Sequence, residues 1–385
     1  MLPLPRNRIT PEENNGMLKG SPTGREQRGS GIVRAWLGTI SLDEIEGGSG
    51  RDAMLKLNSL MLPWPADWAA LFGADRPLIV EIGFGHGEFL LDLARKNPAA
   101  NVIGLEIANR SLLHVERKLE HAGLSNVRVI HSMAETALYH LFVPASIQQI
   151  HVNFPDPWFK TGHSHRRLMQ RDTLDAMVSR LALGGELYLA TDILAYAEMS
   201  HELLAATPGL DNLLSDAWAN ELPGRVVTKY EAIARREGRA CAYFVYRRNH
   251  AIAPDVPVFK DVAMPHIVFA SPLTLNEMAQ RFEPLQYGDA GINIHLMNAF
   301  LSRISLLIEV HVGEPTITQH VALMIIARPN PDSADRNEYT IQLGSIGQPR
   351  PTAGVHRAVR LLADWALNLH PDNRVIKEKV GVSSE

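Results

Sequence analysis

Cysteine is nearly absent from this sequence, which has one, Cys241, among 385 residues. A single thiol excludes an intramolecular disulfide, and it excludes a zinc or iron–sulfur site built from several cysteines. No stretch approaches about 18 consecutive apolar residues, as a membrane-spanning helix requires. The first residues, Met1 to Arg8, lack the apolar core of a signal peptide. We therefore expect a cytoplasmic protein that does not contact a membrane.

An excess of positive charge is lacking as well. The 38 Lys and Arg residues are outnumbered by 42 Asp and Glu residues, which gives a net charge of −4. This excludes a uniformly basic protein that binds nucleic acid or anionic membranes by bulk charge, but it allows a local basic patch. The 16 histidines are scattered and show no metal-ligand spacing, so no metal site is predicted.

The length predicts two to three domains. Residues 1–50 are rich in Pro, Gly, Ser and Asn, which is typical of a disordered or loosely packed arm. Residues 51–250 form the first expected domain, and the Pro- and Val-rich stretch 251–265 is a predicted linker. Residues 266–385 form an expected α+β module, since a helix, several strands and a long helix follow one another.

Short apolar runs alternate with amphipathic stretches in the first expected domain. Strands are predicted at 78–82, 102–106, 127–130, 147–153, 186–191 and 240–247. Helices are predicted at 88–96, 110–122, 171–183 and 196–206. This alternation predicts an α/β fold with a doubly wound, mostly parallel sheet. Ligands of such sheets bind beyond the carboxyl ends of the strands.

The first predicted strand runs into Glu81-Ile82-Gly83-Phe84-Gly85-His86-Gly87. Three glycines in five residues permit a tight turn and a close approach of the backbone to a ligand. Glu81 would repel a pyrophosphate and favour a cationic ligand such as S-adenosylmethionine. Glu106 ends the second strand, where a carboxylate can accept hydrogen bonds from both ribose hydroxyls. The alternative is an ordinary strand–helix turn with surface carboxylates.

The fourth predicted strand runs into Asn153-Phe154-Pro155-Asp156-Pro157-Trp158-Phe159-Lys160. Two prolines make this loop rigid, as suits a loop that presents a reacting group. Its aromatic side chains can stack on a base, and Asp156 can accept hydrogen bonds from the exocyclic groups of that base. The alternative is a structural proline turn in which Trp158 covers the core.

Residues 55–250 resemble the bacterial tRNA (guanine-N7-)-methyltransferase family. The resemblance rests on the glycine loop 81–87, Gly104-Leu105-Glu106, Phe-Pro-Asp-Pro-Trp at 154–158, Arg166-Arg167, Ala190-Thr191-Asp192 and Thr228-Lys229-Tyr230-Glu231. It implies a Rossmann-like class I methyltransferase fold, with S-adenosylmethionine as cofactor and tRNA as partner. The implied reaction is methylation of N7 of guanine 46, in the variable loop.

The resemblance also implies the roles of individual residues. The implied cofactor contacts are Glu81, Gly83, Gly85, Gly87, Glu106, Met133 and Asp156. The implied substrate contacts are Lys160, Arg166, Arg167, Asp192, Thr228, Lys229, Tyr230 and Glu231. Met133 stands where the family has Asp or Asn, so a side-chain contact with the adenine and a backbone contact both stay open.

Guanine N7 carries an exposed lone pair and no proton, so its methylation needs no general base. A nearby carboxylate that stabilises the growing positive charge of the ring is enough, and Asp156 is the predicted catalytic residue. Between Arg225 and Arg248, seven basic and two acidic residues form a second expected RNA surface, in addition to the basic residues that follow the Asp156 loop.

Two other functions fit the residues: methylation of another nucleobase or a small molecule, and an inactive RNA-binding scaffold. The C-terminal module could grip tRNA, form a dimer or be purely structural. A monomer and a homodimer both fit the sequence.

Overall fold

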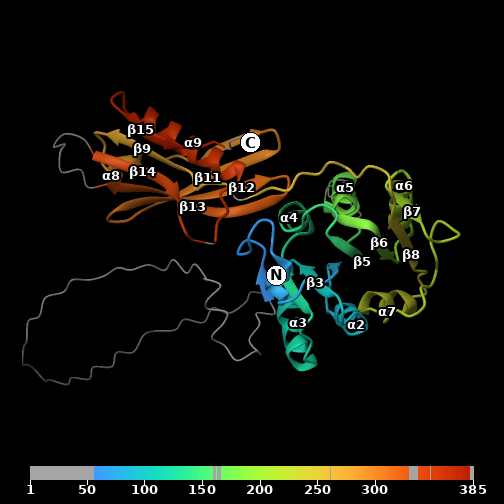
Figure 1. The fold of residues 1–385 in the computed structure, drawn as a ribbon. Helices are drawn as coiled ribbons and strands as arrows, with labels where there is room; N and C mark the ends of the chain where they lie inside the picture. The colour runs from blue at the N-terminus through green and yellow to red at the C-terminus, as the bar shows by residue number, and fades with distance from the viewer. Residues whose placement is uncertain are drawn as a thin grey trace, which may run out of the picture. The chain divides into compact units, whose positions relative to one another are not determined.

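The computed structural model describes residues 56–158, 162, 166–260, 262–328, 337–346 and 348–381. The predicted arm at 1–50 and the predicted substrate residue Lys160 lie outside the described residues. All described residues belong to one compact unit, Met54–Glu385. They form two β-sheets (Figure 1). The division of the chain at 251–265 into separate domains stays a prediction.

The first sheet has the strand order β1-β4-β3-β2-β5-β6-β8-β7. Its strands are β1 (Lys56–Asn58), β2 (Leu78–Ile82), β3 (Asn101–Glu106), β4 (Val127–His131), β5 (Ile147–Asn153), β6 (Leu181–Thr191), β7 (Leu210–Asn212) and β8 (Ala242–Arg248). Neighbouring strands from β1 to β6 pair in parallel, whereas β8 pairs antiparallel with β6 and β7. The prediction of a mostly parallel sheet is confirmed.

Helices cover both faces of this sheet. They are α1 (Trp68–Phe72), α2 (Glu88–Lys96), α3 (Asn109–Ala122), α4 (Ala134–His140), α5 (Arg171–Arg180), α6 (Leu194–Ala205) and α7 (Lys229–Arg236). Successive residues of a strand point to opposite faces, so Val80 and Ile82 of β2 pack with α4, α5 and α6, whereas Ile79 packs with α2 and α3. Every residue of β2 is consequently buried, including Glu81 on the face of Ile79.

One predicted boundary is wrong. The helix predicted over 171–183 ends at Arg180, and β6 begins at Leu181, five residues before the predicted strand. Leu181 already pairs with Ile147 of β5, and the register then shifts before Glu186 pairs with Gln149. Gly184 has a φ of +76° and lies in this irregularity. Pairing with β5 therefore overrides the local helical pattern.

The second sheet is antiparallel, with the order β10-β11-β12-β13-β14-β9-β15. Its elements are β9 (His266–Ser271), α8 (Leu275–Gln280), β10 (Leu285–Asp289), β11 (Ile292–Leu301), β12 (Ser305–Glu314), β13 (Ile317–Arg328), β14 (Asn337–Leu343), α9 (Ala353–Asn368) and β15 (Arg374–Lys379). Val355, Val359 and Leu362 of α9 share a buried cluster with apolar side chains of the strands. One face of the sheet is thereby covered, and the predicted α+β character is confirmed.

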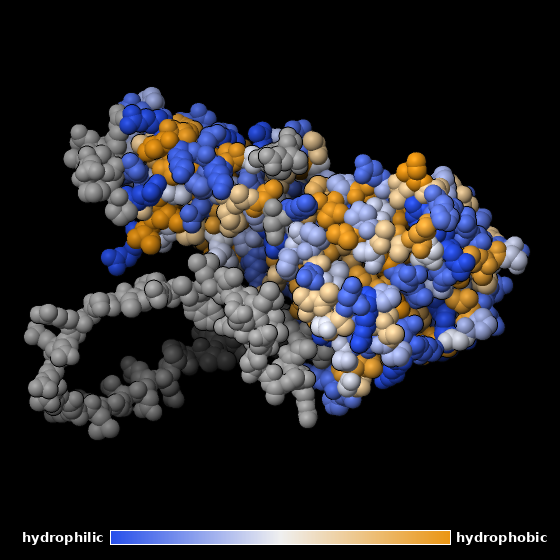
Figure 2. Space-filling view, viewed as in Figure 1, coloured by the Kyte–Doolittle hydropathy of each residue, from blue (hydrophilic) through white to orange (hydrophobic). Residues whose placement is uncertain are grey.

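The segment between the sheets, residues 251–265, has no helix or strand in its described residues. It nevertheless makes specific contacts with the first sheet's helices. Arg180 is fully buried, and its guanidinium donates hydrogen bonds to the backbone oxygens of Leu138, Val256 and Pro257. Hydrophilic and hydrophobic residues are interspersed over the face of the molecule that Figure 2 shows. No helix among the described residues is long and apolar enough to cross a membrane.

Candidate functional site

The glycine loop connects β2 to α2 at the carboxyl edge of the first sheet. Gly83, Gly85 and Gly87 have φ values of +72°, +53° and +75°, in the left-handed region that favours glycine. At Gly87 space is restricted as well, because an added Cβ would lie 2.5 Å from Cγ2 of Val115. The backbone conformation of this loop therefore explains why glycine occupies these three positions.

Glu81 is 1% exposed, although it was predicted to contact a cofactor. Its Oε1 accepts a hydrogen bond from Nδ2 of Asn153 at 3.0 Å, whereas its Oε2 has no hydrogen-bond partner among the described residues. Burial raises the pKa of the Glu81 carboxyl to about 8, against the opposing effects of the Asn153 hydrogen bond and the Arg225 charge. A buried oxygen without a partner is unfavourable, and a cationic ligand group would remove that cost.

Arg225 is a site residue that the sequence analysis did not single out. Its Nη2 donates a hydrogen bond to Oδ1 of Asn153 at 2.7 Å, so Asn153 bridges Arg225 and Glu81. The guanidinium lies 4.6 Å from the ring centroid of Phe89 and 5.2 Å from that of Tyr243. In the sequence Arg225 is one basic residue among seven, and nothing local marks it as partly buried.

Glu106 lies at the end of β3, as predicted, but its carboxylate is largely occupied. Oε1 accepts hydrogen bonds from the backbone amides of Ile107 and Ala108, and Oε2 accepts one from the amide of Gly85, all at about 3 Å. A carboxylate offers roughly four acceptor positions, so one position on Oε2 is left. The carboxylate thus fixes the glycine loop and retains one acceptor position for a ribose hydroxyl in this arrangement, and the contact with both hydroxyls stays a prediction.

The loop after β5 carries Asp156, which is exposed. Phe154 and Trp158 have φ values of +50° and +41°, which are unusual for residues other than glycine and mark a strained backbone. Arg167 holds the far end of this loop, because Nε and Nη2 donate hydrogen bonds to the backbone oxygens of Pro157 and Trp158. Arg166 lies over the ring of Trp158 at 5.1 Å. Both arginines therefore support the loop that presents Asp156.

The predicted substrate segment 228–231 forms the start of α7. Thr228 is the N-cap, and its hydroxyl accepts a hydrogen bond from the amide of Glu231 while Glu231 accepts one from the amide of Thr228. Lys229 extends to the glycine loop, with Nζ at 3.3 Å from Nε2 of His86. Residues 228–230, the glycine loop, Glu81 and Asn153 together line a cavity of about 30 Å³.

The remaining predicted residues lie near this edge of the sheet without joining the cavity. Met133 precedes α4 and is 46% exposed. Asp192 follows β6, and its Oδ2 is 2.7 Å from Nη2 of Arg239. The contacts of these residues with a cofactor or substrate stay predictions.

The expected basic surface between Arg225 and Arg248 is largely used within the chain. Five of its seven basic residues bind protein groups: Arg225 to Asn153, Arg235 to Glu231, Arg239 to Asp192, Arg247 to Glu186 and Arg248 to backbone oxygens. A phosphate would therefore have to compete with these partners, and the role of this surface in RNA binding stays a prediction.

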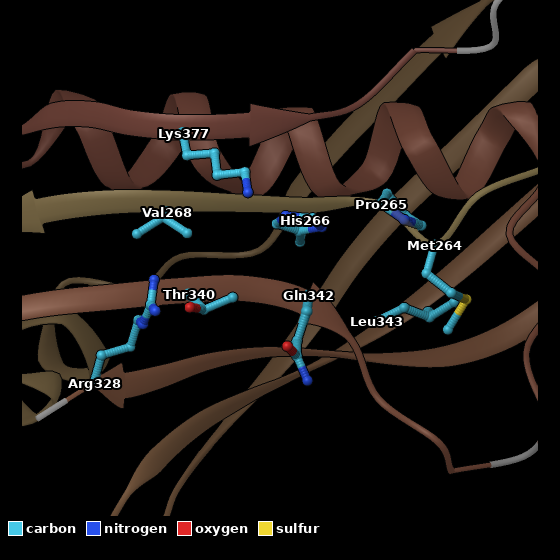
Figure 3. Close-up of a pocket in the computed structure, with 9 residues that line it drawn as sticks. All are labelled: Met264, Pro265, His266, Val268, Arg328, Thr340, Gln342, Leu343 and Lys377. Carbon is cyan, nitrogen blue, oxygen red and sulfur yellow. The ribbon is translucent and has the colours of Figure 1, made fainter.

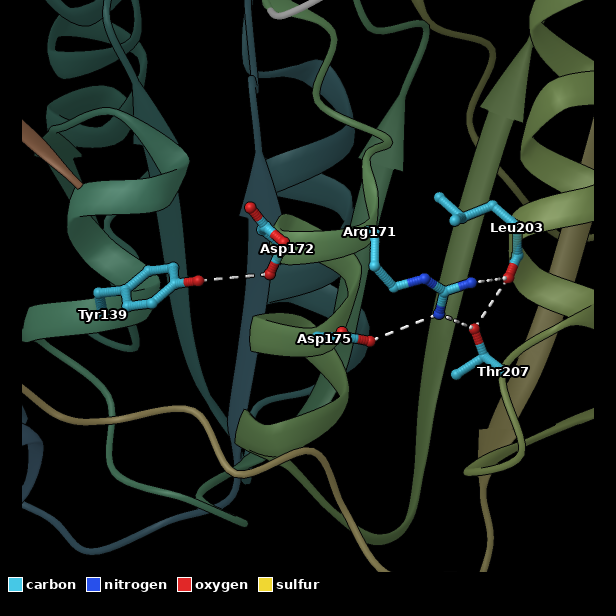
Figure 4. A network of polar contacts seen from close by, with 6 residues as sticks. All are labelled: Tyr139, Arg171, Asp172, Asp175, Leu203 and Thr207. Carbon is cyan, nitrogen blue, oxygen red and sulfur yellow. Dashed lines mark hydrogen bonds and ion pairs between the residues drawn. The ribbon is translucent and has the colours of Figure 1, made fainter. Parts of the chain in front are cut away.

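Arg171, which was expected to extend the basic surface after the Asp156 loop, is also committed. It forms an ion pair with Asp175 at 3.4 Å and donates hydrogen bonds to Thr207 and to the backbone oxygen of Leu203 (Figure 4). It thereby ties α5 to the end of α6, and a phosphate would have to compete with these partners.

His86, Glu88 and His114 lie close enough for one atom from each to bind a metal ion. Two of these side chains, Glu88 and His86, already contact lysine ammonium groups, however. Nζ of Lys118 lies 2.6 Å from Oε1 of Glu88, and Lys229 lies beside His86. A metal ion would have to displace an ammonium group from Glu88 and from His86, so the cluster is better suited to fixing the glycine loop.

Comparisons with known proteins match part of the chain. The family model "Putative methyltransferase" matches residues 75–243. The chain is 38% identical to the tRNA (guanine-N(7)-)-methyltransferase of Burkholderia cenocepacia strain HI2424 over 187 residues, which are 49% of this chain and 73% of that relative. It is 37% identical to the protein of the same name from Geobacter metallireducens over 196 residues, 51% of this chain and 92% of that relative. These matches extend over about half of the chain.

Proposed function

The chain belongs to the tRNA (guanine-N(7)-)-methyltransferase family, and from this membership we propose that it methylates N7 of a guanine in tRNA with S-adenosylmethionine as methyl donor. The proposed target is guanine 46 in the variable loop. Because the substrate is tRNA, we place the activity in the cytoplasm.

The observation that carries the proposal is the buried Glu81 carboxyl beside the glycine loop. Its Oε2 is the unpartnered acceptor of the small cavity, and it suits the ammonium group of the cofactor. The remaining acceptor position of Glu106 suits one ribose hydroxyl. When bound, the cofactor supplies a methyl group on a positively charged sulfur.

The present cavity has room for about one water molecule, so Lys229 and Tyr230 must move aside for the cofactor. Tyr230 is 54% exposed, and Lys229 contacts its ring and His86 rather than a carboxylate. Both side chains can turn outward without breaking an ion pair. The capping box of Thr228 and Glu231 would keep the first turn of α7 intact during this movement.

The chain's contribution to catalysis is alignment and electrostatic stabilisation. The Asp156 carboxylate lies on a loop that Arg167 holds at Pro157 and Trp158. At this position it can orient the guanine and stabilise the positive charge that the ring acquires as N7 gains the methyl group. No side chain needs to remove a proton, because N7 carries none.

The test is methyl transfer from labelled S-adenosylmethionine to an unmodified tRNA transcript, followed by strand cleavage specific to 7-methylguanine. We expect cleavage at position 46, and none in a transcript with adenine there. Asp156→Ala should lower turnover at least a hundredfold with an unchanged melting temperature. Asp255→Ala, at an exposed aspartate in the segment between the sheets, serves as the charge-matched control. Methylation at another atom or nucleotide would overturn the assignment.

A further inference from the structure

The second sheet carries a pocket that lies apart from the residues discussed so far. It has a volume of about 450 Å³ and lies over β13, β14, β9 and β15 (Figure 3). Ile267 and Ile341 point into the core beneath α9, so their strand neighbours Val268 and Thr340, which line the pocket, lie on the opposite face. The pocket is therefore on the sheet face that α9 leaves uncovered.

Three groups that can carry positive charge converge on this pocket. Arg328 comes from β13, Lys377 from β15 and His266 from β9. Figure 3 shows the side chains of Arg328 and Lys377 reaching toward each other over Val268. In the sequence His266 and Arg328 are 62 positions apart, and Arg328 and Lys377 are 49 positions apart. Strand pairing brings them together.

No carboxylate balances these positive groups within the described lining of the pocket. No Asp or Glu lines the pocket there, and neither Arg328, Lys377 nor His266 forms an ion pair or a side-chain hydrogen bond with a described residue. Glu378, which follows Lys377, is turned away and lies 2.7 Å from Nη2 of Arg360. Glu338 pairs with Arg328 across β13 and β14, so its side chain lies on the same face of the sheet, next to the pocket but outside its lining.

The rest of the lining narrows the class of ligand. The Thr340 hydroxyl and the Gln342 amide provide hydrogen-bond donors beside the positive groups. A planar guanidinium with an ammonium nearby suits the oxygens of a phosphate group. Met264 and Leu343 make the other end of the pocket apolar, which offers a surface for a ribose ring or a base. A nucleotide unit matches both ends better than an inorganic anion does.

We propose that this pocket binds a phosphate group of the tRNA substrate, as a second contact of the enzyme with RNA. The proposal rests on the proposed function for the identity of the nucleic acid. Arg328 and Lys377 bind the phosphate oxygens, and His266 and Thr340 add hydrogen bonds. Such a contact gives affinity that depends on salt and is independent of base sequence.

The test removes two positive charges in Arg328→Gln/Lys377→Gln and compares this variant with Arg303→Gln/Lys260→Gln. The control loses the same charge at exposed residues outside the pocket. Binding of labelled tRNA is measured by fluorescence anisotropy at several salt concentrations, so the result does not depend on turnover. The melting temperatures verify that both variants fold.

For the pocket variant we expect about tenfold weaker tRNA binding near physiological salt. The slope of log affinity against log salt concentration should become less steep by about 1, as expected for the loss of one phosphate contact. The KM for tRNA should rise with kcat unchanged, and the control should stay within twofold of the unmodified protein. Equal losses in both variants would indicate a general charge effect and overturn the proposal.

A second arm separates RNA phosphate from a free ligand. Guanosine 5′-monophosphate and inorganic phosphate are titrated calorimetrically into the unmodified protein and the pocket variant. Binding that is lost in the pocket variant, with tRNA affinity unchanged, would identify a site for a free phosphate compound and overturn the RNA assignment. If tRNA binds through the pocket but guanine N7 is not methylated, the proposed function fails and the pocket assignment stands.

Discussion

The buried carboxyl of Glu81 predicts a specific dependence of stability on pH. Its pKa is raised from 4.5 to about 8 by burial, so the folded protein holds a proton that the unfolded chain releases above pH 4.5. The stability contributed by this group is complete below pH 4.5 and is lost as pH rises toward 8. Glu81→Gln keeps the planar shape of the side-chain end and the oxygen that accepts the hydrogen bond from Asn153, but it cannot titrate.

The size of the effect follows from the two pKa values. Between pH 6 and pH 8 the unfolded carboxyl is ionised throughout, whereas the folded one goes from almost fully protonated to about half ionised. The difference in bound protons, summed over this pH interval, amounts to roughly 1.7 pH units, or about 2 kcal/mol of unfolding free energy. The free energy of unfolding of the unmodified protein should therefore fall by about 2 kcal/mol more than that of Glu81→Gln. His140 and His151, whose pKa values burial lowers to about 4 and about 3, have the opposite sign below pH 6.5 and cancel in this difference.

Urea denaturation at pH 6, 7 and 8, followed by tryptophan fluorescence, provides the measurement. Trp64 and Trp68 are buried in the core of the first sheet and report its unfolding. Glu120→Gln, at an exposed glutamate of α3, should show the pH dependence of the unmodified protein. Parallel pH curves for the unmodified protein and Glu81→Gln would refute the assignment of a raised pKa to this carboxyl.

Two further changes test the backbone around the site. Gly87→Ala should destabilise the protein more than Gly73→Ala. Both positions have φ near +70°, but only at Gly87 would the added Cβ lie against Val115. Equal losses in the urea midpoint would argue against this clash. Thr228→Ala should lower the free energy of unfolding by about 1 kcal/mol, because it removes the N-cap of α7. Thr228→Ser should retain most of the original stability. A serine variant as unstable as the alanine variant would indicate that the hydroxyl is not the stabilising group.

Local sequence patterns were sufficient for much of the first sheet. The apolar run that ends at Gly83 predicted β2 with the observed ends, because a strand buried on both faces is mostly apolar. The ends of β5 were also predicted as observed. The glycine loop was equally readable, since its three glycines all adopt left-handed backbone angles. Short elements such as β1 and β7 were missed, because three residues carry no periodic pattern and their pairing depends on distant strands.

The sequence by itself determined the longer strands and most of the longer helices of the first sheet, the glycine loop and the position of Asp156 at a strand end, because these depend on residues near one another in the chain. Only the tertiary structure decided which charges are free. Packing buries Glu81 and couples it through Asn153 to Arg225, and it pairs five of the seven basic residues that sequence proximity had grouped together. Strand pairing gathers Arg328, Lys377 and His266, which the sequence left scattered. The reason is physical: the pKa and the availability of a charged group depend on burial and on neighbours in space, which chain order does not specify.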